Sequence, residues 1–254
     1  MTATEAMTNA LAAAWRQLRD VLLPRGCAGC ACPDAVLCTE CAQALRRPVA
    51  FTLPRSAAGH GIACGTYRGP VRHAILSWKD HGDAEADGPF ADALADLFDT
   101  AGAPIIAALD PMPTGIGIVP APSSSRSTRR RGRRHLDPLA DALAAHCRSR
   151  GLSDTQVLPM LRVHAVHGKS VQTHGARDRM RRIHGRIIVD DAIWPASTMP
   201  LVLLDDIVTT GATIGACADA LVDAGHDVLT AFALAYTPPK DKGDADDGAG
   251  DGCR

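Results

Sequence analysis

Apolar runs bounded by turn residues alternate along this chain with segments in which apolar residues recur at helical spacing. The apolar runs predict strands from residue 62 and at residues 115–119, 158–163, 187–189, 201–204 and 228–235. The helically spaced segments lie at residues 71–79, 90–101, 137–148 and 214–222. Because short apolar runs suit buried parallel strands, this alternation indicates an α/β fold. We expect a mainly parallel sheet flanked by helices.

The two ends of the chain depart from this alternation. Residues 5–22 have helical propensity, and Pro24 ends the predicted helix. A cysteine-rich stretch follows, so residues 1–47 are expected to form an N-terminal module. Residues 48–61 carry Pro, Gly and Ser and are expected to link this module to a main domain at residues 62–239. Residues 240–254 are rich in Gly and Asp and are predicted to be disordered.

The most informative segment begins with the predicted strand at Leu201. This strand ends in two adjacent carboxylates, Asp205 and Asp206, and a loop of threonines around one glycine leads into the next helix. Ligands of parallel sheets bind at the carboxyl ends of the strands, and the start of a helix is a ready anion site. The order favours a ligand with hydroxyl and phosphate groups, together with a divalent cation. Asp-Asp alone is equally common as a cap or turn.

Composition narrows the functional classes. The chain has 254 residues, of which 46% are hydrophobic and 22% charged, and its formal net charge is −1. These values suit one main domain with a small appendage and give no global attraction to nucleic acid or anionic membranes. The longest apolar runs are too short to span a bilayer, and the N-terminus lacks the uninterrupted apolar core of a signal peptide. We therefore expect a cytoplasmic protein without membrane insertion.

Cysteines cluster near the start of the chain. Two CxxC pairs, Cys27 with Cys30 and Cys38 with Cys41, form the ligand pattern of a structural zinc site. A short segment without an apolar core needs such a staple. Cys32 could replace Cys30 if the register slips. Free cysteines are the alternative, and a redox pair is less favoured because a redox CxxC normally opens a helix after a strand.

Two basic segments lie between the predicted strands. Arginines at residues 126–134 directly follow a predicted loop at residues 120–125, which should face the same edge of the sheet as Asp205. Arginine side chains at this edge suit bidentate binding of phosphate oxygens. The alternative is a solvated surface or a nucleic-acid patch. The second segment, residues 166–186, carries a basic run from Arg177 to Arg186. The histidines at 164, 167, 174 and 184 lack the spacing of metal ligands and are expected on the surface.

The string after Leu201 resembles the phosphoribosyl-pyrophosphate (PRPP) signature of type I phosphoribosyltransferases. The matching residues are Asp205, Asp206, Thr209, Thr210, Gly211, Ala212 and Thr213. This resemblance implies a type I phosphoribosyltransferase fold that binds PRPP with Mg²⁺. The acidic pair would hold the ribose hydroxyls as the catalytic carboxylates, and the threonine loop would bind the 5′-phosphate. It also implies a pyrophosphate loop at Ala121, Pro122, Ser123 and Arg126 and a mobile lid at residues 166–186.

The order of motifs over most of the chain is similar to that of the ComF/GntX family. Proteins of this family are phosphoribosyltransferase-like and are linked to DNA uptake in competence in some bacteria. The shared features are a CxxC…CxxC knuckle, the YRGPV string at residues 67–71, and later motifs at residues 120–122, 131–132, 172 and 205–213. The resemblance implies that Lys79 and Arg131 also serve the pyrophosphate.

This chain departs from the family pattern at two places. An aromatic residue and Asn-Gln usually follow the Arg-Gly motif, but Arg133, Arg134 and His135 stand there. The Asn expected near the end of the lid is absent, and Arg182 lies close to its place. Both departures concern the acceptor and the lid, and they leave the phosphate motif intact.

Two functional hypotheses from different classes follow. The first is an enzyme that transfers the phosphoribosyl group of PRPP to a nitrogenous acceptor. The second is a non-catalytic module that keeps the PRPP fold and handles nucleotides or single-stranded DNA. Besides PRPP, the candidate partners are single-stranded DNA and proteins of the competence machinery. Aromatic residues make up only 4% of the chain, which leaves few stacking platforms for single strands. The sequence identifies neither the acceptor base nor the oligomeric state.

Overall fold

The computed structural model describes residues 26–80, 82–109, 111–123, 132–163, 187–190 and 199–239. Several predicted features lie outside the described residues. They are the helix at residues 5–22, Arg126 and Arg131 of the predicted pyrophosphate site, the histidines at 164, 167, 174 and 184, the lid at 166–186 with its basic run, and the tail at 240–254.

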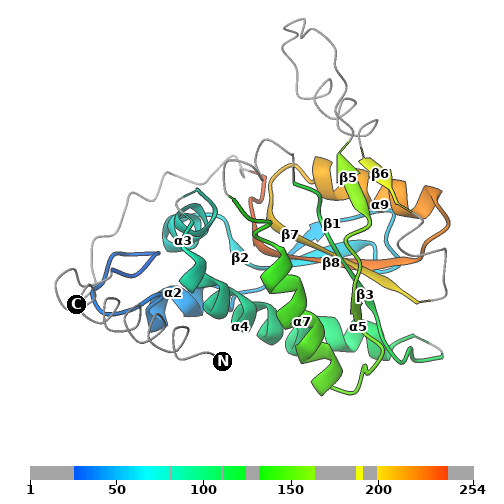
Figure 1. Ribbon diagram of the computed structural model, residues 1–254, viewed down its shortest axis with the longest axis horizontal. Coiled ribbons are helices and arrows are strands. Elements are labelled where there is room, and N and C mark those ends of the chain that lie inside the picture. Colours follow the sequence, from blue (N-terminus) through cyan, green and yellow to red (C-terminus); the bar gives the residue numbers. More distant parts are fainter. Residues whose placement is uncertain are drawn as a thin grey trace, which may run out of the picture.

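A six-stranded sheet forms the centre of the fold, in the order β1-β2-β8-β7-β3-β4. Its strands are β1 (Val49–Thr52), β2 (His60–Thr66), β3 (Gly117–Pro120), β4 (Gln156–Val157), β7 (Leu201–Val208) and β8 (Val228–Tyr236). Neighbouring strands are parallel, except for the antiparallel pair β1 and β2. The structure thus confirms the predicted mainly parallel sheet (Figure 1).

Strand β1 lies within residues 48–61, which the sequence presents as a linker. It pairs antiparallel with β2, and Phe51 and Leu53 are buried in the core. The structure therefore corrects the expectation of a linker, because this segment belongs to the main sheet. Within β1 only Phe51 is buried, so the strand offers no alternation long enough to be recognised in the sequence.

Only the second half of the segment expected as a strand at residues 158–163 forms one. β4 of the main sheet ends before it, at Val157, and β5 (Leu161–Val163) pairs antiparallel with β6 (Ile187–Val189). These two short strands form a second sheet and enclose residues 164–186 in the sequence.

Helices cover both faces of the main sheet (Figure 1). One face carries α3 (Gly69–Asp80), α4 (Asp87–Leu97), α5 (Ala103–Ala107) and α7 (Asp137–Ser149), and the other carries α9 (Ala212–Asp223). The turns η1 (Ala84–Ala86) and η2 (Phe98–Gly102) flank α4, and η2 is π-helical. No helix in the described part of the chain combines the length and hydropathy required to cross a membrane.

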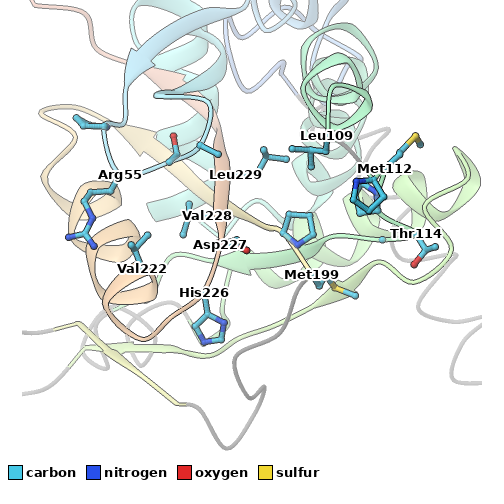
Figure 2. A pocket seen from close by; sticks show the side chains of 17 residues that line it. Arg55, Leu109, Met112, Thr114, Met199, Val222, His226, Asp227, Val228 and Leu229 are labelled. Carbon is cyan, nitrogen blue, oxygen red and sulfur yellow. The ribbon is translucent and has the colours of Figure 1, made fainter.

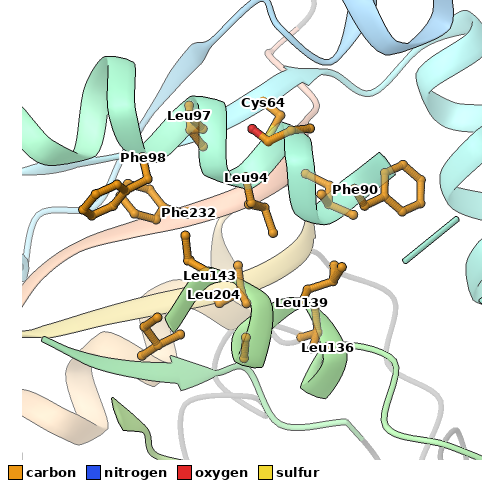
Figure 3. Packing of buried hydrophobic residues seen from close by; sticks show 14 of the residues in the cluster. Cys64, Phe90, Leu94, Leu97, Phe98, Leu136, Leu139, Leu143, Leu204 and Phe232 are labelled. Atoms are coloured by element: carbon orange, nitrogen blue, oxygen red, sulfur yellow. The ribbon is translucent and has the colours of Figure 1, made fainter. Parts of the chain in front are cut away.

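The alternation of β7 determines which way its carboxylates point. Leu203 joins the core beneath α9, whereas Leu204 joins the core beneath α4 and α7. Figure 3 shows Leu204 in that second core, near Leu143 of α7. Because successive side chains of a strand point to opposite faces, Asp205 continues the α9 side and Asp206 the α4 side.

Candidate functional site

Asp205 and Asp206 lie at the carboxyl end of β7, beside a cavity of about 230 Å³. The cavity is lined by Lys79, Ala121, Pro122, Ser123, His135, Leu136, Asp205, Asp206, Ile207 and Thr213. The backbone N–H of Asp206 donates to Asp205 Oδ1 at 2.8 Å, which fixes one oxygen of the first carboxylate. Both side chains are buried, with 9% of Asp205 and 5% of Asp206 exposed.

The cavity brings together residues that the sequence assigned to separate segments. Residues 121–123 follow β3, the neighbour of β7, and the Ala121 N–H donates to the Leu204 carbonyl at 2.8 Å. Lys79 comes from the last turn of α3, and Thr213 from the first turn of α9. Arg126 and Arg131, also predicted for the pyrophosphate, lie outside the described residues.

The loop between β7 and α9 has the conformation of an open anion site. Thr209 and Thr210 are exposed, and Gly211 adopts a left-handed φ of 75°, a conformation that favours glycine. α9 begins at Ala212, whose N–H donates to Thr210 Oγ1 at 3.4 Å, and its N-cap residue Gly211 has no side chain that could cap the helix. Free N–H groups at the start of a helix attract anions. The loop can therefore bind a phosphate at the edge of the cavity.

Lys79 and His135 meet on the same oxygen of Asp206. Lys79 Nζ and His135 Nε2 each lie 2.5 Å from Asp206 Oδ2. Burial opposes ionisation of Asp206, but the His135 hydrogen bond and the Lys79 charge outweigh it and lower the pKa of Asp206 to about 2. Asp206 is therefore ionised at neutral pH.

Asp205 has the opposite electrostatic character. Burial raises its pKa to about 7, and the charge of Asp206 adds to the rise. Two neighbouring carboxylates thus have separated pKa values, because only Asp206 is held by a cation. Near neutral pH the pair can both accept hydrogen bonds and, through a protonated Asp205, donate one.

His135 was not among the residues predicted for the site. Its ring is 3% exposed and meets the Trp78 ring edge-on, with 4.9 Å between centroids. Trp78 Nε1–H donates to Asp87 Oδ1 at 2.5 Å, and Arg133 binds both oxygens of Asp87 at 2.6 and 3.0 Å. Arg133 of the basic run is therefore paired away from the carboxylates. The only signal in the sequence was the departure from the family pattern at residues 133–135.

The four cysteines of the two CxxC pairs also come together. The sulfur atoms of Cys27, Cys30, Cys38 and Cys41 all lie within 4.8 Å of one another, and those of Cys30 and Cys38 are 3.6 Å apart. A tetrahedral zinc ion with Zn–S bonds of about 2.3 Å separates its sulfurs by roughly 3.8 Å. The cluster can therefore hold a metal such as zinc. Cys32 is not one of its members.

The electrostatics of the cluster favour a cation. Burial opposes ionisation of Cys27, but backbone N–H groups, including those of Cys38 and Gly29 at 3.2 and 3.4 Å, lower its pKa to about 7. Burial and the neighbouring sulfurs raise the pKa of Cys41. The four thiols cannot all ionise at this spacing unless a metal ion compensates their charge.

The acidic pair is not a preformed cation site. Within the described ranges, the cysteine cluster is the only group of three or more His, Cys, Asp or Glu side chains placed to hold a metal ion. Lys79 already neutralises Asp206.

A larger cavity of about 1000 Å³ lies near the amino ends of the strands (Figure 2). Its lining includes Gly115 before β3, Met199 before β7 and Val228 at the start of β8. The lining is mainly apolar. We assign the candidate site to the smaller cavity, because the paired carboxylates, the lysine and the histidine meet there and because parallel sheets bind ligands at the carboxyl ends of their strands.

Comparisons with known proteins give little beyond this geometry. No family model and no curated protein matches the sequence. Among solved structures, the chain is similar to adenine phosphoribosyltransferase from Saccharomyces cerevisiae in complex with D-2,5-dideoxy-2,5-imino-altritol 1,6-bisphosphate and adenine. The identity is 14% and the TM-score 0.37, over 78% of this chain and 89% of that chain. A likeness at this level assigns no function, so the proposal below rests on the residues of the site.

Proposed function

We propose that the protein binds PRPP with Mg²⁺ beside Asp205 and Asp206 and transfers its phosphoribosyl group to a nitrogenous acceptor. One observation carries the proposal: a single cavity joins the two carboxylates to residues 121–123 and to the first turn of α9. Those are the places at which the sequence motif expects the ribose, the pyrophosphate and the 5′-phosphate.

The ribose fits the two carboxylates because each has one oxygen already engaged. Asp205 Oδ1 accepts from the Asp206 N–H, and Asp206 Oδ2 is bound by Lys79 and His135. The second oxygen of each carboxylate is then the acceptor for one of the two neighbouring ribose hydroxyls. The 5′-phosphate would lie on residues 209–213, where the α9 dipole favours an anion.

The pyrophosphate would lie between residues 121–123 and Lys79. Its charge is compensated by Lys79 and by the Mg²⁺ that it brings, and both stabilise the negative charge that develops as it leaves C1′. The cavity of about 230 Å³ is below the roughly 300 Å³ at which small-molecule pockets begin. PRPP binding therefore requires the cavity to widen. Of the charged side chains that line the cavity, that of Lys79 is the most exposed.

The four clustered cysteines are proposed to bind one structural zinc ion. Their spacing and the N–H···S hydrogen bonds to Cys27 suit that metal, and two of the four, Cys27 and Cys41, are buried. Thiolates bound to zinc, and not paired in disulfides, are expected in a reducing cytoplasm. The cluster lies close to α3, because a Cβ placed on Gly29 would be 3.1 Å from the Pro70 carbonyl oxygen.

Transfer is tested by measuring pyrophosphate release from PRPP in Mg²⁺ buffer against a panel of purine, pyrimidine and other nitrogenous acceptors, with zinc content measured on the same preparation. Release that depends on one acceptor class is the expected result. A protein that binds PRPP and releases no pyrophosphate with any acceptor would contradict the transferase.

A non-catalytic module that handles nucleotides or single-stranded DNA is the second candidate. The observation that favours it is the departure at residues 133–135, where Arg133, Arg134 and His135 replace the aromatic residue and Asn-Gln of the family pattern on the acceptor side. Retention on single-stranded DNA that weakens steeply with salt would support this function and a link to DNA uptake, whereas no retention would count against it.

A further inference from the structure

We propose that His135 is a positioning residue that holds the Asp206 carboxylate in place while Lys79 moves from that carboxylate to the phosphate groups of the ligand. The inference rests on the PRPP site proposed above. It assigns different tasks to two groups that share one oxygen in the free protein.

The two partners of Asp206 differ in their freedom to move. The Lys79 side chain is 22% exposed, whereas those of His135 and Asp206 are 3% and 7% exposed. Lysine carries its charge on a flexible four-carbon stem, so it can turn toward a more highly charged partner. A pyrophosphate in the cavity is such a partner. Lys79 is therefore the group that exchanges, and His135 is the group that stays.

A chain of contacts from three elements fixes His135. Its ring packs edge-on against Trp78 of α3, whose indole N–H donates to Asp87, the first residue of α4. A carboxylate is favoured at that end of a helix. Arg133, two residues before His135, completes the chain by its two hydrogen bonds to Asp87. The guanidinium also lies 6.0 Å from the centroid of the Trp78 ring.

The need for such a residue follows from the burial of Asp206. Once Lys79 turns away, a carboxylate whose side chain is 7% exposed would face the ribose without a partner. An unpaired buried charge is strongly unfavourable, and it would take up a proton or shift its position. The His135 hydrogen bond keeps Asp206 ionised and aimed, so that its free oxygen continues to accept a ribose hydroxyl.

Calorimetric titrations of three probes test the two tasks: inorganic pyrophosphate, ribose 5-phosphate and PRPP, each in Mg²⁺ buffer. His135→Ala should weaken the binding of pyrophosphate and of PRPP by about tenfold or more, because each draws Lys79 away and leaves Asp206 without its charge-assisted hydrogen bond. It should leave the binding of ribose 5-phosphate within about twofold, because Lys79 then stays on Asp206. Lys79→Met should also weaken the binding of pyrophosphate and PRPP and spare that of ribose 5-phosphate. His135→Gln, whose amide N–H can donate from nearly the same place, should restore the binding of PRPP.

Each outcome decides the matter. Wild-type affinity of His135→Ala for PRPP would overturn the role of His135 and leave the PRPP site standing, whereas a wild type that binds none of the probes would overturn both. If His135→Ala does not fold, His135→Gln is compared with His135→Asn, whose shorter side chain cannot reach Asp206. The Gln variant should bind PRPP about tenfold more tightly than the Asn variant, and equal affinities would overturn the proposal.

Discussion

Lys79 and Asp206 form an ion pair of 2.5 Å that connects the last turn of α3 to the carboxyl end of β7. The free site thus carries its own countercharge where a ligand is proposed to bind. A phosphorylated ligand must separate this pair, and it must offer Lys79 a better partner than one carboxylate.

Replacing Lys79 by Met should therefore weaken binding of inorganic pyrophosphate by about tenfold or more, because a charge-assisted contact is lost. Arg46→Met is the matched control. Arg46 pairs with Asp96 through side chains that are about half exposed, 52% and 48%, away from the cavity. Calorimetry in Mg²⁺ buffer measures both variants. If Lys79→Met binds pyrophosphate as tightly as Arg46→Met does, Lys79 does not contact the pyrophosphate.

The raised pKa of Asp205 predicts how stability depends on pH. Folding raises this pKa from 3.8 to about 7, so between these values the unfolded chain has lost a proton that the folded protein keeps. The stability of the wild type should therefore fall as pH rises from about 4 to 7 and then level off. The lowered pKa of Asp206 acts below this window, because its contribution is lost only as pH falls from 3.8 through about 2.

Asp205→Asn removes the titration. The free energy of unfolding of this variant, relative to that of the wild type, should increase by on the order of a few kcal/mol between pH 4.5 and pH 8. Its melting temperature should increase relative to that of the wild type over the same range. Scanning calorimetry at several pH values measures this difference. A difference that is the same at both ends of the range would show that Asp205 titrates normally.

Gly211 and Gly215 provide a matched pair for the phosphate loop. Both have open space where a Cβ would stand, but Gly211 has a φ of 75° and Gly215 lies within α9. Gly211→Ala should cost about 1 kcal/mol in stability and weaken binding of ribose 5-phosphate, because alanine resists the left-handed conformation. Gly215→Ala should be neutral or stabilise by about 0.5–1 kcal/mol. Thermal melts with and without ribose 5-phosphate distinguish them, and equal effects would contradict the role of Gly211.

The cysteine cluster predicts which thiols hold the metal. Cys41→Ser should remove zinc from the purified protein and lower its melting temperature by about 5 °C or more, because metal binding contributes to folding. Cys32→Ser should leave both unchanged, since Cys32 is outside the cluster. Elemental analysis with thermal melts tests this, and zinc retained by Cys41→Ser but lost by Cys32→Ser would reverse the assignment.

The sequence could predict the parts of the site that are local. Asp205 to Thr213 form one contiguous motif, and the spacing of the CxxC pairs was enough to foresee a cluster of four sulfurs. The sheet followed from the alternation of strands and helices. These features depend on periodicity and on neighbours within a few residues.

Other parts depend on contacts that no local pattern carries. His135 is 71 positions from Asp206, and Arg133 is 46 positions from Asp87. Within a run of basic residues nothing shows which side chain is buried, so His135 could not be singled out. Strand β1 was missed for the same reason, because its four residues are recognised as a strand only by their pairing with β2, and only Phe51 among them is buried.

The central claim is tested most directly by titrating PRPP in Mg²⁺ buffer into the wild type and into the double variant Asp205→Asn, Asp206→Asn. Each substitution keeps the shape of the side chain and removes its charge. The account predicts saturable binding to the wild type at one site per chain, and affinity lower by about a hundredfold or more in the variant, since the ionised acceptor of Asp206 and the hydrogen bond of Asp205 to the ribose are lost. Undiminished binding by the variant, or no binding by the wild type, would contradict it.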